Sequence, residues 1–293
     1  MTTFTDNLTI KQIKQQAASI AETLAVPQFW LTDWLLYVID KPSLFLMTDE
    51  RYQLTDSESA KFNAGIKKMQ QGIPLAYLTG HQAFWSLDFK VNAHTLIPRP
   101  DTEVLVEQVL EWIENNPIAN HKASKRLLDL GTGSGCIAIS LAHELARSSW
   151  QVIAVDLSLE ALDIARHNAD FNGVTNIEYI QSSWYQALPT EDECRFDVIV
   201  SNPPYIDEAD EHLAGLTAEP ISALSAPNHG LADIEHIIQQ APSYLCKKGL
   251  LAIEHGHDQG VAVRRLFLEN GFESVHTVQD YGGNDRVTVG QYP

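Results

Sequence analysis

Arg126–Gly135 reads RLLDLGTGSG, an apolar run of strand length followed at once by three glycines in five residues. A second apolar run, of helical character, begins directly afterwards at Cys136–Ala142. Strand, glycine-rich turn and helix in this order are typical of the first unit of an open α/β sheet, in which the glycines let a ligand approach the backbone closely. We therefore expect a bound ligand at this turn.

The spacing of the glycines indicates which ligand to expect. A dinucleotide fold has the pattern G-x-G-x-x-G, whose third glycine would fall at Cys136. A phosphate-binding P-loop would need a Lys-Ser/Thr pair, which does not follow here. The G-x-G-x-G form with Asp129 just before it resembles instead the S-adenosylmethionine loop of class I methyltransferases. This resemblance assigns five residues to cofactor binding: Gly131, Thr132, Gly133, Ser134 and Gly135.

Strand-like and helix-like segments alternate from Arg126 onward. We expect strands at 126–130, 151–155, 176–180, 196–201 and 249–254, with helices near 135–147, 158–171 and 231–245. Two further strands are indicated near Val275 and at Val287–Val289. The alternation predicts an α/β fold with a doubly wound sheet of seven strands.

Two residues that follow expected strands are candidates for cofactor contacts. Asp156 ends the second strand, where a carboxylate can accept hydrogen bonds from both ribose hydroxyls. The alternative is a helix cap, although Ser158 is also suited to that role. Trp184 follows the third strand, where its ring can lie against the adenine. A tryptophan of the core is the equally open alternative for Trp184.

Asn202-Pro203-Pro204-Tyr205 follows the apolar strand Phe196–Val200. Ligands of open α/β sheets lie beyond the carboxyl ends of the strands, so Asn202 is placed for chemistry. The two prolines fix φ and remove two N–H donors, which leaves the Asn202 side-chain oxygen and the Pro203 carbonyl as rigid acceptors. With the flat ring of Tyr205 beside them, they suit a planar NH2 group conjugated to a carbonyl or a ring. The alternative is a Pro-Pro turn that only ends a strand.

The segment 8–71 carries helical patterns. Apolar residues recur at spacings of three and four from Ile10 to Leu24, and Trp30–Val38 indicates a second helix. Thr55-Asp56-Ser57-Glu58 is a capping-box signal for a further helix, which Gly72-Ile73-Pro74 ends. We expect a small helical domain at 1–74 that docks the substrate, and a second domain at 75–293.

A β-hairpin is expected to link the two domains. Apolar and polar residues alternate with a clean period of two from Trp85 to Val91, which predicts a half-buried strand. Tyr77–Gly80 is expected to be its shorter partner strand.

The segment Ile97–Glu103 is stiffened by Pro98 and Pro100. One interpretation is a linker in which Asp101 or Thr102 caps the following helix, which runs to about Trp112. The other is a rigid rim over an active site. In that case Arg99 and Glu103 would face the site.

Composition and charge limit the possible partners. The chain has 293 residues with 44% hydrophobic and 20% charged residues, as in ordinary globular proteins. Its formal charge of −18 fits a phosphate backbone poorly, so we expect protein or small-molecule partners and no direct nucleic-acid binding. Residues 1–16 lack the apolar core of a signal peptide and no run is long enough to span a membrane, which favours a cytoplasmic location without membrane contact. Three scattered cysteines fit reduced thiols, and the histidines show no spacing that predicts a metal site.

The motifs together carry a family resemblance. Asn202–Tyr205 with Asp129–Gly135 resembles the amino-group methyltransferases, which include DNA adenine enzymes and protein glutamine enzymes. Further stretches narrow the resemblance to the bacterial release factor glutamine methyltransferases, over nearly the whole chain. These stretches are Ala76–Gly80, Phe84-Trp85, Ile97–Glu103, Glu254–Gly256 and Asp280–Arg286.

The resemblance implies methylation of the side-chain N5 of the glutamine in the Gly-Gly-Gln motif of class 1 peptide chain release factors. S-adenosylmethionine would be the methyl donor and S-adenosylhomocysteine the product, and we expect a monomer. The cofactor residues implied are Gly131–Gly135, Asp156, Trp184 and Asn202. Asn202, Pro203 and Tyr205 would be catalytic, and the substrate would contact Asn202, Pro203, Pro204, Tyr205, Arg99 and Glu103.

The chain departs from the family pattern at two places. Ser183 stands where the family often has Asp before the tryptophan, which affects adenine recognition. Thr217 and Ala218 stand where it often has Arg and an aromatic residue before Glu219, which affects the loop after the active site.

Two other classes of function compete with this interpretation. One is a nucleic-acid amino methyltransferase that uses the same Asn-Pro-Pro-Tyr motif, against which the acidic composition argues. The other is a non-catalytic cofactor-binding module, against which the intact Asn202–Tyr205 argues.

Overall fold

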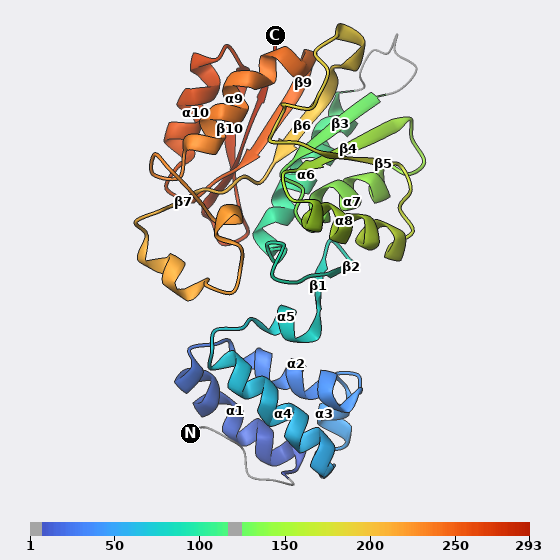
Figure 1. Cartoon of the computed structure of the whole chain (residues 1–293), viewed down its shortest axis with the longest axis vertical. Coiled ribbons are helices and arrows are strands. Elements are labelled where there is room, and N and C mark those ends of the chain that lie inside the picture. Colours follow the sequence, from blue (N-terminus) through green and yellow to red (C-terminus); the bar gives the residue numbers. More distant parts are fainter. Residues whose placement is uncertain (1–7, 117–124) are drawn as a thin grey trace. The chain divides into compact units, whose positions relative to one another are not determined.

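The computed structural model describes residues 8–116 and 125–293, and the chain divides into two compact units, 8–80 and 81–293 (Figure 1). The units meet in sequence after Gly80, later than the boundary expected at residue 74. Residues 1–7 of the expected first domain, and with them part of the segment 1–16, lie outside the described residues.

The first unit is helical, with α1 at Ile10–Leu24, α2 at Gln28–Ile39, α3 at Phe45–Thr48, α4 at Asp56–Met69 and α5 at Leu75–Thr79. The predicted capping box is confirmed, because the Thr55 hydroxyl accepts from Glu58 N while the Glu58 carboxylate accepts from Thr55 N. Inside the unit, α2 and α4 touch where Gly65 leaves no side chain: a Cβ there would lie 2.2 Å from the Trp34 ring. The Trp34 indole donates to the Phe62 carbonyl at 3.0 Å, so a buried polar group is satisfied.

The expected hairpin exists, but its parts lie elsewhere than predicted. Tyr77–Gly80 is not a strand: it belongs to α5 and its Gly80 C-cap, which has a left-handed φ of 79°. The hairpin pairs β1 at His81–Phe84 with β2 at Leu87–Lys90. Trp85 and Ser86 form the turn with φ of 51° and 57°, so the predicted continuous strand from Trp85 is wrong at its start. Neither residue is a glycine or asparagine, which are the usual residues of such turns. The alternation of apolar and polar residues continues through them, so the pattern carried no sign of the turn.

The second unit confirms the predicted seven-stranded doubly wound sheet. Its spatial order is β10-β11-β9-β6-β3-β4-β5. The strands are β3 Lys125–Leu130, β4 Trp150–Asp156, β5 Ile177–Gln181, β6 Phe196–Ser201, β9 Leu245–Glu254, β10 Glu273–Gln279 and β11 Asp285–Gln291. β3, β4, β5, β6 and β9 run parallel, while β11 is antiparallel to both β9 and β10. The order reverses at β3, between β4 and β6, which is where open α/β sheets bind ligands.

Helices cover both faces of this sheet (Figure 1). Side chains from α6 at Glu103–Asn115 and α7 at Cys136–Glu144 form one apolar core with the sheet, and α8 at Leu159–Phe171 packs beside them. α9 at Ala232–Tyr244 and α10 at Gly260–Glu269 form the core on the other face. Along β3 the buried Leu127 belongs to the first core and Leu128 to the second, as the period of a strand requires. The sequence patterns did not predict α10.

One asparagine joins the hairpin to the glycine loop. The Asn168 side chain on α8 is fully buried, and its oxygen accepts from Lys90 N at 2.8 Å. Its nitrogen donates to the carbonyls of Lys90 and Ser134, at 3.0 and 2.8 Å. The Ser134 end of the loop is therefore held by α8 through Asn168, whose side chain is itself fixed by β2.

Two-residue strands β7 at Ile206–Asp207 and β8 at Ser225–Ala226 pair in parallel and close off the loop that follows β6. The short 3-10 helices η1 at Pro100–Thr102, η2 at Asp192–Cys194, η3 at Glu211–Gly215 and η4 at Ile221–Ala223 complete the described elements. In the part of the chain that the structure describes, no helix has the length and apolar character needed to cross a membrane.

Candidate active site

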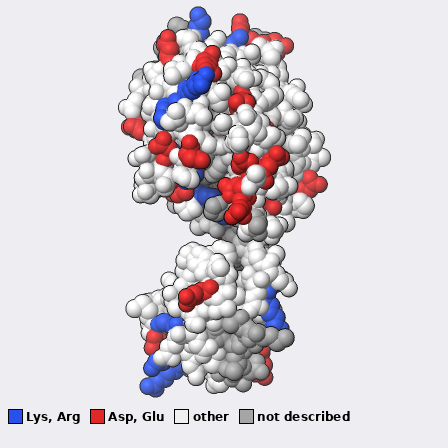
Figure 2. Space-filling model, turned by 90° about the vertical axis from the view of Figure 1, so that its left-hand side faces the viewer, with Lys and Arg blue, Asp and Glu red and all other residues white. Residues whose placement is uncertain are grey.

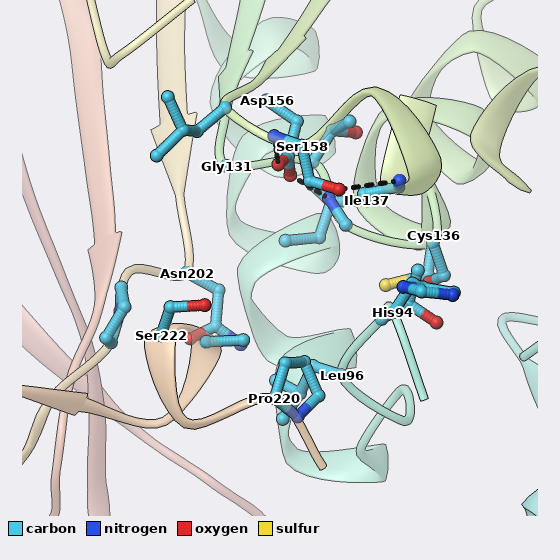
Figure 3. Close-up of a pocket in the computed structure, with 18 of the residues that line it drawn as sticks. His94, Leu96, Gly131, Cys136, Ile137, Asp156, Ser158, Asn202, Pro220 and Ser222 are labelled. Atoms are coloured by element: carbon cyan, nitrogen blue, oxygen red, sulfur yellow. Dashed lines mark hydrogen bonds between the residues drawn. The ribbon is translucent and has the colours of Figure 1, made fainter. Parts of the chain in front are cut away.

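A pocket of about 480 Å³ opens where the strand order reverses (Figure 3). Four parallel strands each supply a residue at or just after the carboxyl end, namely Gly131, Asp156, Ser182 and Asn202. The remaining wall comes from the segments 93–102 and 220–223. In Figure 3, Asp156 and Ser158 lie on one side of the pocket and Leu96 and Pro220 on the opposite side.

The glycine loop depends on left-handed backbone conformations. Gly131, Gly133 and Gly135 have φ of 73°, 55° and 84°. Residues other than glycine rarely adopt such positive backbone angles. A Cβ on Gly131 would also lie 3.3 Å from the Trp184 ring. Gly131, Thr132, Gly133 and Ser134 line the pocket, whereas Gly135 lies outside the lining and is the N-cap residue of α7.

Asp129 lies beneath this loop, fully buried. Its Oδ2 accepts from the Thr132 hydroxyl at 2.7 Å, and its Oδ1 has no hydrogen-bond partner among the described residues. Burial raises the pKa of Asp129 to about 7, although the hydrogen bond from Thr132 opposes the rise. Asp129 is fully buried and does not line the pocket, so its carboxylate supports the loop from beneath through Thr132.

Asp156 connects the loop to the next helix. Its Oδ2 accepts from Gly133 N at 2.8 Å and its Oδ1 accepts from Ser158 N at 2.9 Å. Burial raises its pKa, and these backbone hydrogen bonds oppose the rise. The predicted cap role of Ser158 is confirmed, because its hydroxyl accepts from Ala161 N at 3.1 Å.

Trp184 lines the pocket with a backbone φ of 50°, an uncommon value for a residue other than glycine. The Ser182 hydroxyl donates to the Trp184 carbonyl at 2.8 Å and supports this conformation. Asp233, near the start of α9, also lines the pocket. Burial raises the pKa of Asp233, and the neighbouring Trp184 side chain opposes the rise.

Asn202 lies at the end of β6 with its side chain in the pocket. Its Nδ2 donates to the Thr102 hydroxyl oxygen at 3.3 Å. Within the described residues no donor reaches Asn202 Oδ1, so this oxygen is available to accept from a ligand. Thr102 stands at the N-cap position of α6, as one of the two predicted cap residues, but its side chain makes no cap hydrogen bond and accepts from Asn202 instead.

The rest of the motif has a different environment. Pro204 lines the pocket, whereas Pro203 and Tyr205 lie outside the lining. The Tyr205 hydroxyl donates to Glu254 Oε1 at 3.2 Å, and the Tyr205 carbonyl accepts from Gln259 Nε2 at 3.0 Å. Burial raises the pKa of Tyr205, so the ring remains a neutral phenol.

Of the two residues predicted to face the site from the rim, Arg99 lines the pocket and Glu103 does not. Arg99 lines the pocket and forms an ion pair with Glu219, whose side chain is only 1% exposed. The other Glu219 oxygen accepts from Ile97 N at 3.0 Å, so one carboxylate holds both residues. Glu103 does not line the pocket: its carboxylate accepts from Trp85 N at 2.9 Å, in the hairpin turn. Arg99 and Glu103 are close in sequence, which suggested that both side chains face the pocket. The sequence could not show that they point in different directions.

The functional candidates that sequence reasoning missed are acidic or hydroxyl residues from other elements. They are Thr102, Glu219, Asp233 and Glu254. Thr102 and Glu254 stand in stretches that carry the family resemblance, and Glu219 follows a place where the chain departs from the family pattern. No sequence signal pointed to Asp233. Within 8–116 and 125–293, no group of three His, Cys, Asp or Glu side chains could hold a metal ion.

Comparisons with known proteins place the chain in a class and then in a family. A family model for a methyltransferase domain matches residues 121–282. Among solved structures, the hMettl16 catalytic domain has a TM-score of 0.53 with 18% identity, covering 71% of this chain and 75% of that one. The Thermus thermophilus 16S rRNA methyltransferase RsmC has a TM-score of 0.51 with 17% identity, covering 73% and 50%. The two solved structures show the fold alone. Together with the family model, this fold defines the chain as a class I methyltransferase.

Sequence relatives identify the family. The chain is 43% identical to the release factor glutamine methyltransferase of Aliivibrio fischeri, over 91% of this chain and 90% of that protein. It is 44% identical to that of Escherichia coli, over 88% and 90%. A model of the PrmC N-terminal domain matches residues 27–80. The chain belongs to the release factor glutamine methyltransferase family, as its motifs predicted.

Proposed function

We propose that this protein transfers a methyl group from S-adenosylmethionine to the side-chain N5 of the glutamine in the Gly-Gly-Gln motif of class 1 peptide chain release factors. The observation that carries the proposal is the free Asn202 Oδ1 in the same pocket as the glycine loop. An acceptor at this place suits an NH2 group, and membership of the family indicates which NH2 group it is.

The residues around the glycine loop fit the proposed methyl donor. S-adenosylmethionine supplies a methyl group on a sulfonium, which needs neither a metal nor a covalent enzyme intermediate. Asp156 would accept from the ribose hydroxyls, and Trp184 would contact the adenine. The segment Gly131–Ser134 lines the pocket. Its two glycines carry no side chain, so the methyl donor can approach the backbone there.

The remaining residues would prepare the acceptor nitrogen. A carboxamide nitrogen is a poor nucleophile because its lone pair is shared with the carbonyl. Asn202 Oδ1 and the Pro203 carbonyl would hold its two N–H bonds, which aligns the nitrogen and favours a more pyramidal form. Pro204 and the rim residue Arg99 would limit where the substrate glutamine can lie.

A protein substrate fits the surface better than a nucleic acid. The chain carries 38 acidic and 20 basic residues. On the face shown in Figure 2, acidic side chains occur over the whole larger unit and are densest in its lower half, and the basic side chains form only a small group in its upper half. A phosphate backbone needs a positive track, so the proposal includes no direct nucleic-acid partner. It places the enzyme in the cytoplasm as a monomer, with the helical unit 8–80 docking the release factor.

Transfer of a labelled methyl group tests this function. The protein would be incubated with methyl-labelled S-adenosylmethionine and, separately, release factor, release factor with the motif glutamine changed to alanine, and duplex DNA. We expect label only in the unaltered release factor. Label in DNA, or equal label in the glutamine-to-alanine substrate, would refute the proposal.

A further inference from the structure

Gln259, at the N-cap position of α10, joins three separate segments of the chain, and only 9% of this residue is exposed. Its Nε2 donates to the carbonyls of Tyr205 and His229, each at 3.0 Å. Its Oε1 accepts from Gly256 N at 2.8 Å. All three partners are backbone groups, whose character as donor or acceptor is fixed, so the orientation of the Gln259 amide is fixed as well.

The two carbonyls that Gln259 binds stand at the two ends of the loop 206–228, which contains β7 and β8. This loop supplies one wall of the pocket, at residues 220–223, and it carries Glu219 of the rim. It begins directly after the Asn202–Tyr205 motif. Gln259 therefore closes the loop at its base, where the loop leaves the motif.

The backbone at this base is closely packed. Gly230 has a left-handed φ of 77°, and a Cβ there would lie 2.0 Å from the Tyr205 oxygen and 2.9 Å from Gln259 Nε2. Ile206 N donates to the Leu224 carbonyl at 3.0 Å. Because both of those residues belong to the loop, their hydrogen bond holds the loop together without attaching it to α10.

The motif itself is held at both of its ends. Ser201, just before it, is fully buried, and its hydroxyl donates to the Leu130 carbonyl at 2.7 Å. At the other end, Gln259 holds the Tyr205 carbonyl. Pro203-Pro204 lies between the two ends with fixed φ and no N–H donors. Such a stiff segment passes a displacement of one end on to the rest of the motif.

We propose that Gln259 is a positioning residue that holds the Asn202–Tyr205 motif and the base of the loop 206–228 in the places that the methyl-accepting amide requires. The inference deepens the proposed function and rests on it for its kinetic consequence. Gln259 lies outside the pocket lining, and the cofactor candidates Gly131–Ser134 and Asp156 belong to other elements. Loss of Gln259 should therefore affect methyl transfer and leave cofactor binding in place.

Gln259→Met tests this role, because methionine has a similar length and makes none of the three hydrogen bonds. We expect kcat for release factor methylation to fall by about tenfold or more, since the acceptor nitrogen is misaligned. Kd for S-adenosylhomocysteine should stay within about threefold of the wild type. Gln239→Met, at an exposed position of α9, is the matched control and should keep the wild-type kcat.

Two results would overturn the proposal. One is a wild-type kcat in Gln259→Met. The other is a loss of S-adenosylhomocysteine binding as large as the loss of kcat, because Gln259 would then only support the fold.

Gln259→Glu shows which of the hydrogen bonds matters. An ionised glutamate keeps an acceptor for Gly256 N but has no donor for the carbonyls of Tyr205 and His229. We expect kcat to fall by about tenfold or more, as in Gln259→Met, while Gln239→Glu should keep the wild-type value. A wild-type kcat in Gln259→Glu would show that only the bond to Gly256 matters and would contradict the proposal.

The base of the loop can also be probed without a release factor. A glutamate-specific protease can cut after Glu208 and Glu211, which are exposed residues of the loop. We expect this cleavage to be at least about fivefold faster in Gln259→Met than in the wild type, and unchanged in Gln239→Met, because an unclosed loop opens more often. Equal cleavage rates in Gln259→Met and the wild type would overturn the inference. Faster cleavage of Gln259→Met, in a protein whose wild type does not methylate release factors, would refute the proposed function and leave the clamp supported.

Discussion

Asp156 illustrates how single residues serve both the fold and the site. Both of its carboxylate oxygens already accept from backbone N–H groups, those of Gly133 and Ser158, and the residue still lines the pocket. Each carboxylate oxygen has room for another hydrogen bond, so the same side chain can receive the ribose hydroxyls of the proposed cofactor. The backbone bonds hold the carboxylate in place before the ligand arrives.

Removal of this carboxylate should weaken cofactor binding. We expect Asp156→Ala to raise the Kd for S-adenosylhomocysteine by about 10- to 150-fold, or about 1.5–3 kcal/mol, because charged hydrogen-bond acceptors are lost. Titration calorimetry measures the change. Asp163→Ala, on the exposed surface of α8, is the matched control and should leave Kd unchanged. An unchanged Kd in Asp156→Ala would remove Asp156 from the site.

Buried Glu254 should make the stability of the protein depend on pH. Burial raises the pKa of Glu254 from 4.5 to about 7, while Thr102, Arg286 and Tyr205 oppose the rise and Asp101 adds to it. The folded protein then binds a proton more tightly than the unfolded chain does. Glu254 therefore contributes stability that is fully present below about pH 4.5 and is lost as the pH rises through about 7.

Urea denaturation of the wild type and of Glu254→Gln, each at pH 5 and pH 8, measures this contribution. The free energy of unfolding of the wild type, relative to the variant, should fall by about 2–3 kcal/mol between the two pH values. The comparison with the variant cancels the titration of Asp129, which burial also raises to a pKa of about 7. A relative rise of wild-type stability with pH would mean that Glu254 is ionised more easily in the folded state.

The residues of the site differ in how far the sequence could predict them. Asp156 and Asn202 each follow an apolar run that reads as a buried strand, so their position at one sheet edge could be predicted. Glu219 and Glu254 are acidic residues whose local pattern is that of a solvated loop or a strand end, and only the fold reveals that both are buried. Glu103 was placed on the rim because it follows Arg99 closely, yet it binds the hairpin turn. Local pattern cannot tell which way such a side chain points.

At the scale of elements, the rim of the pocket is made by two segments that one carboxylate joins. Glu219 accepts from Ile97 N and pairs with Arg99, and its neighbour Pro220 lines the pocket. The loop after β6 and the segment before α6 are distant in sequence, so their junction depends on this residue. The same loop contains Thr217 and Ala218, where the chain departs from the usual family pattern.

Glu219→Gln should loosen this junction. The glutamine has only one acceptor oxygen, whereas the Glu219 carboxylate accepts from both Arg99 and Ile97 N. One of these two donors therefore loses its acceptor. We expect KM for the release factor to rise by about five- to fiftyfold, equivalent to about 1–2 kcal/mol, with Kd for S-adenosylhomocysteine nearly unchanged. Steady-state kinetics measure KM, and Glu208→Gln, which changes an exposed residue of the same loop, is the control. The rim would have no role in substrate binding if both variants gave the same KM.

At the scale of the whole molecule, the two units divide the proposed work. Every cofactor candidate and the whole pocket lie in the unit 81–293, and the helical unit 8–80 has a core of its own. The sequence patterns predicted the helices of that unit. They did not predict its C-terminal boundary, because the short helix α5 follows the break at Gly72–Pro74. A separate core would allow the unit to fold by itself and to act as the proposed docking element.

A chain of residues 81–293 tests this division. We expect it to bind S-adenosylhomocysteine with a Kd within about threefold of the full chain, because the cofactor site is complete without the helical unit. Its kcat/KM on intact release factor should fall by about tenfold or more, through loss of docking contacts. On a short Gly-Gly-Gln peptide, which is too small to be docked, the truncated and full chains should be equal. Full activity of the truncated chain on intact release factor would show that the helical unit does not dock it.

The most direct measurement of the central claim is mass spectrometry of the release factor peptide that contains Gly-Gly-Gln, after reaction with wild-type protein or with Asn202→Ala. We expect the wild type to add one methyl group to the glutamine side chain. Asn202→Ala should add none while it still binds S-adenosylhomocysteine, because the acceptor that aligns the amide nitrogen is gone. Near-normal methylation of that glutamine by Asn202→Ala would contradict the account and leave Asn202 as a residue that only ends a strand.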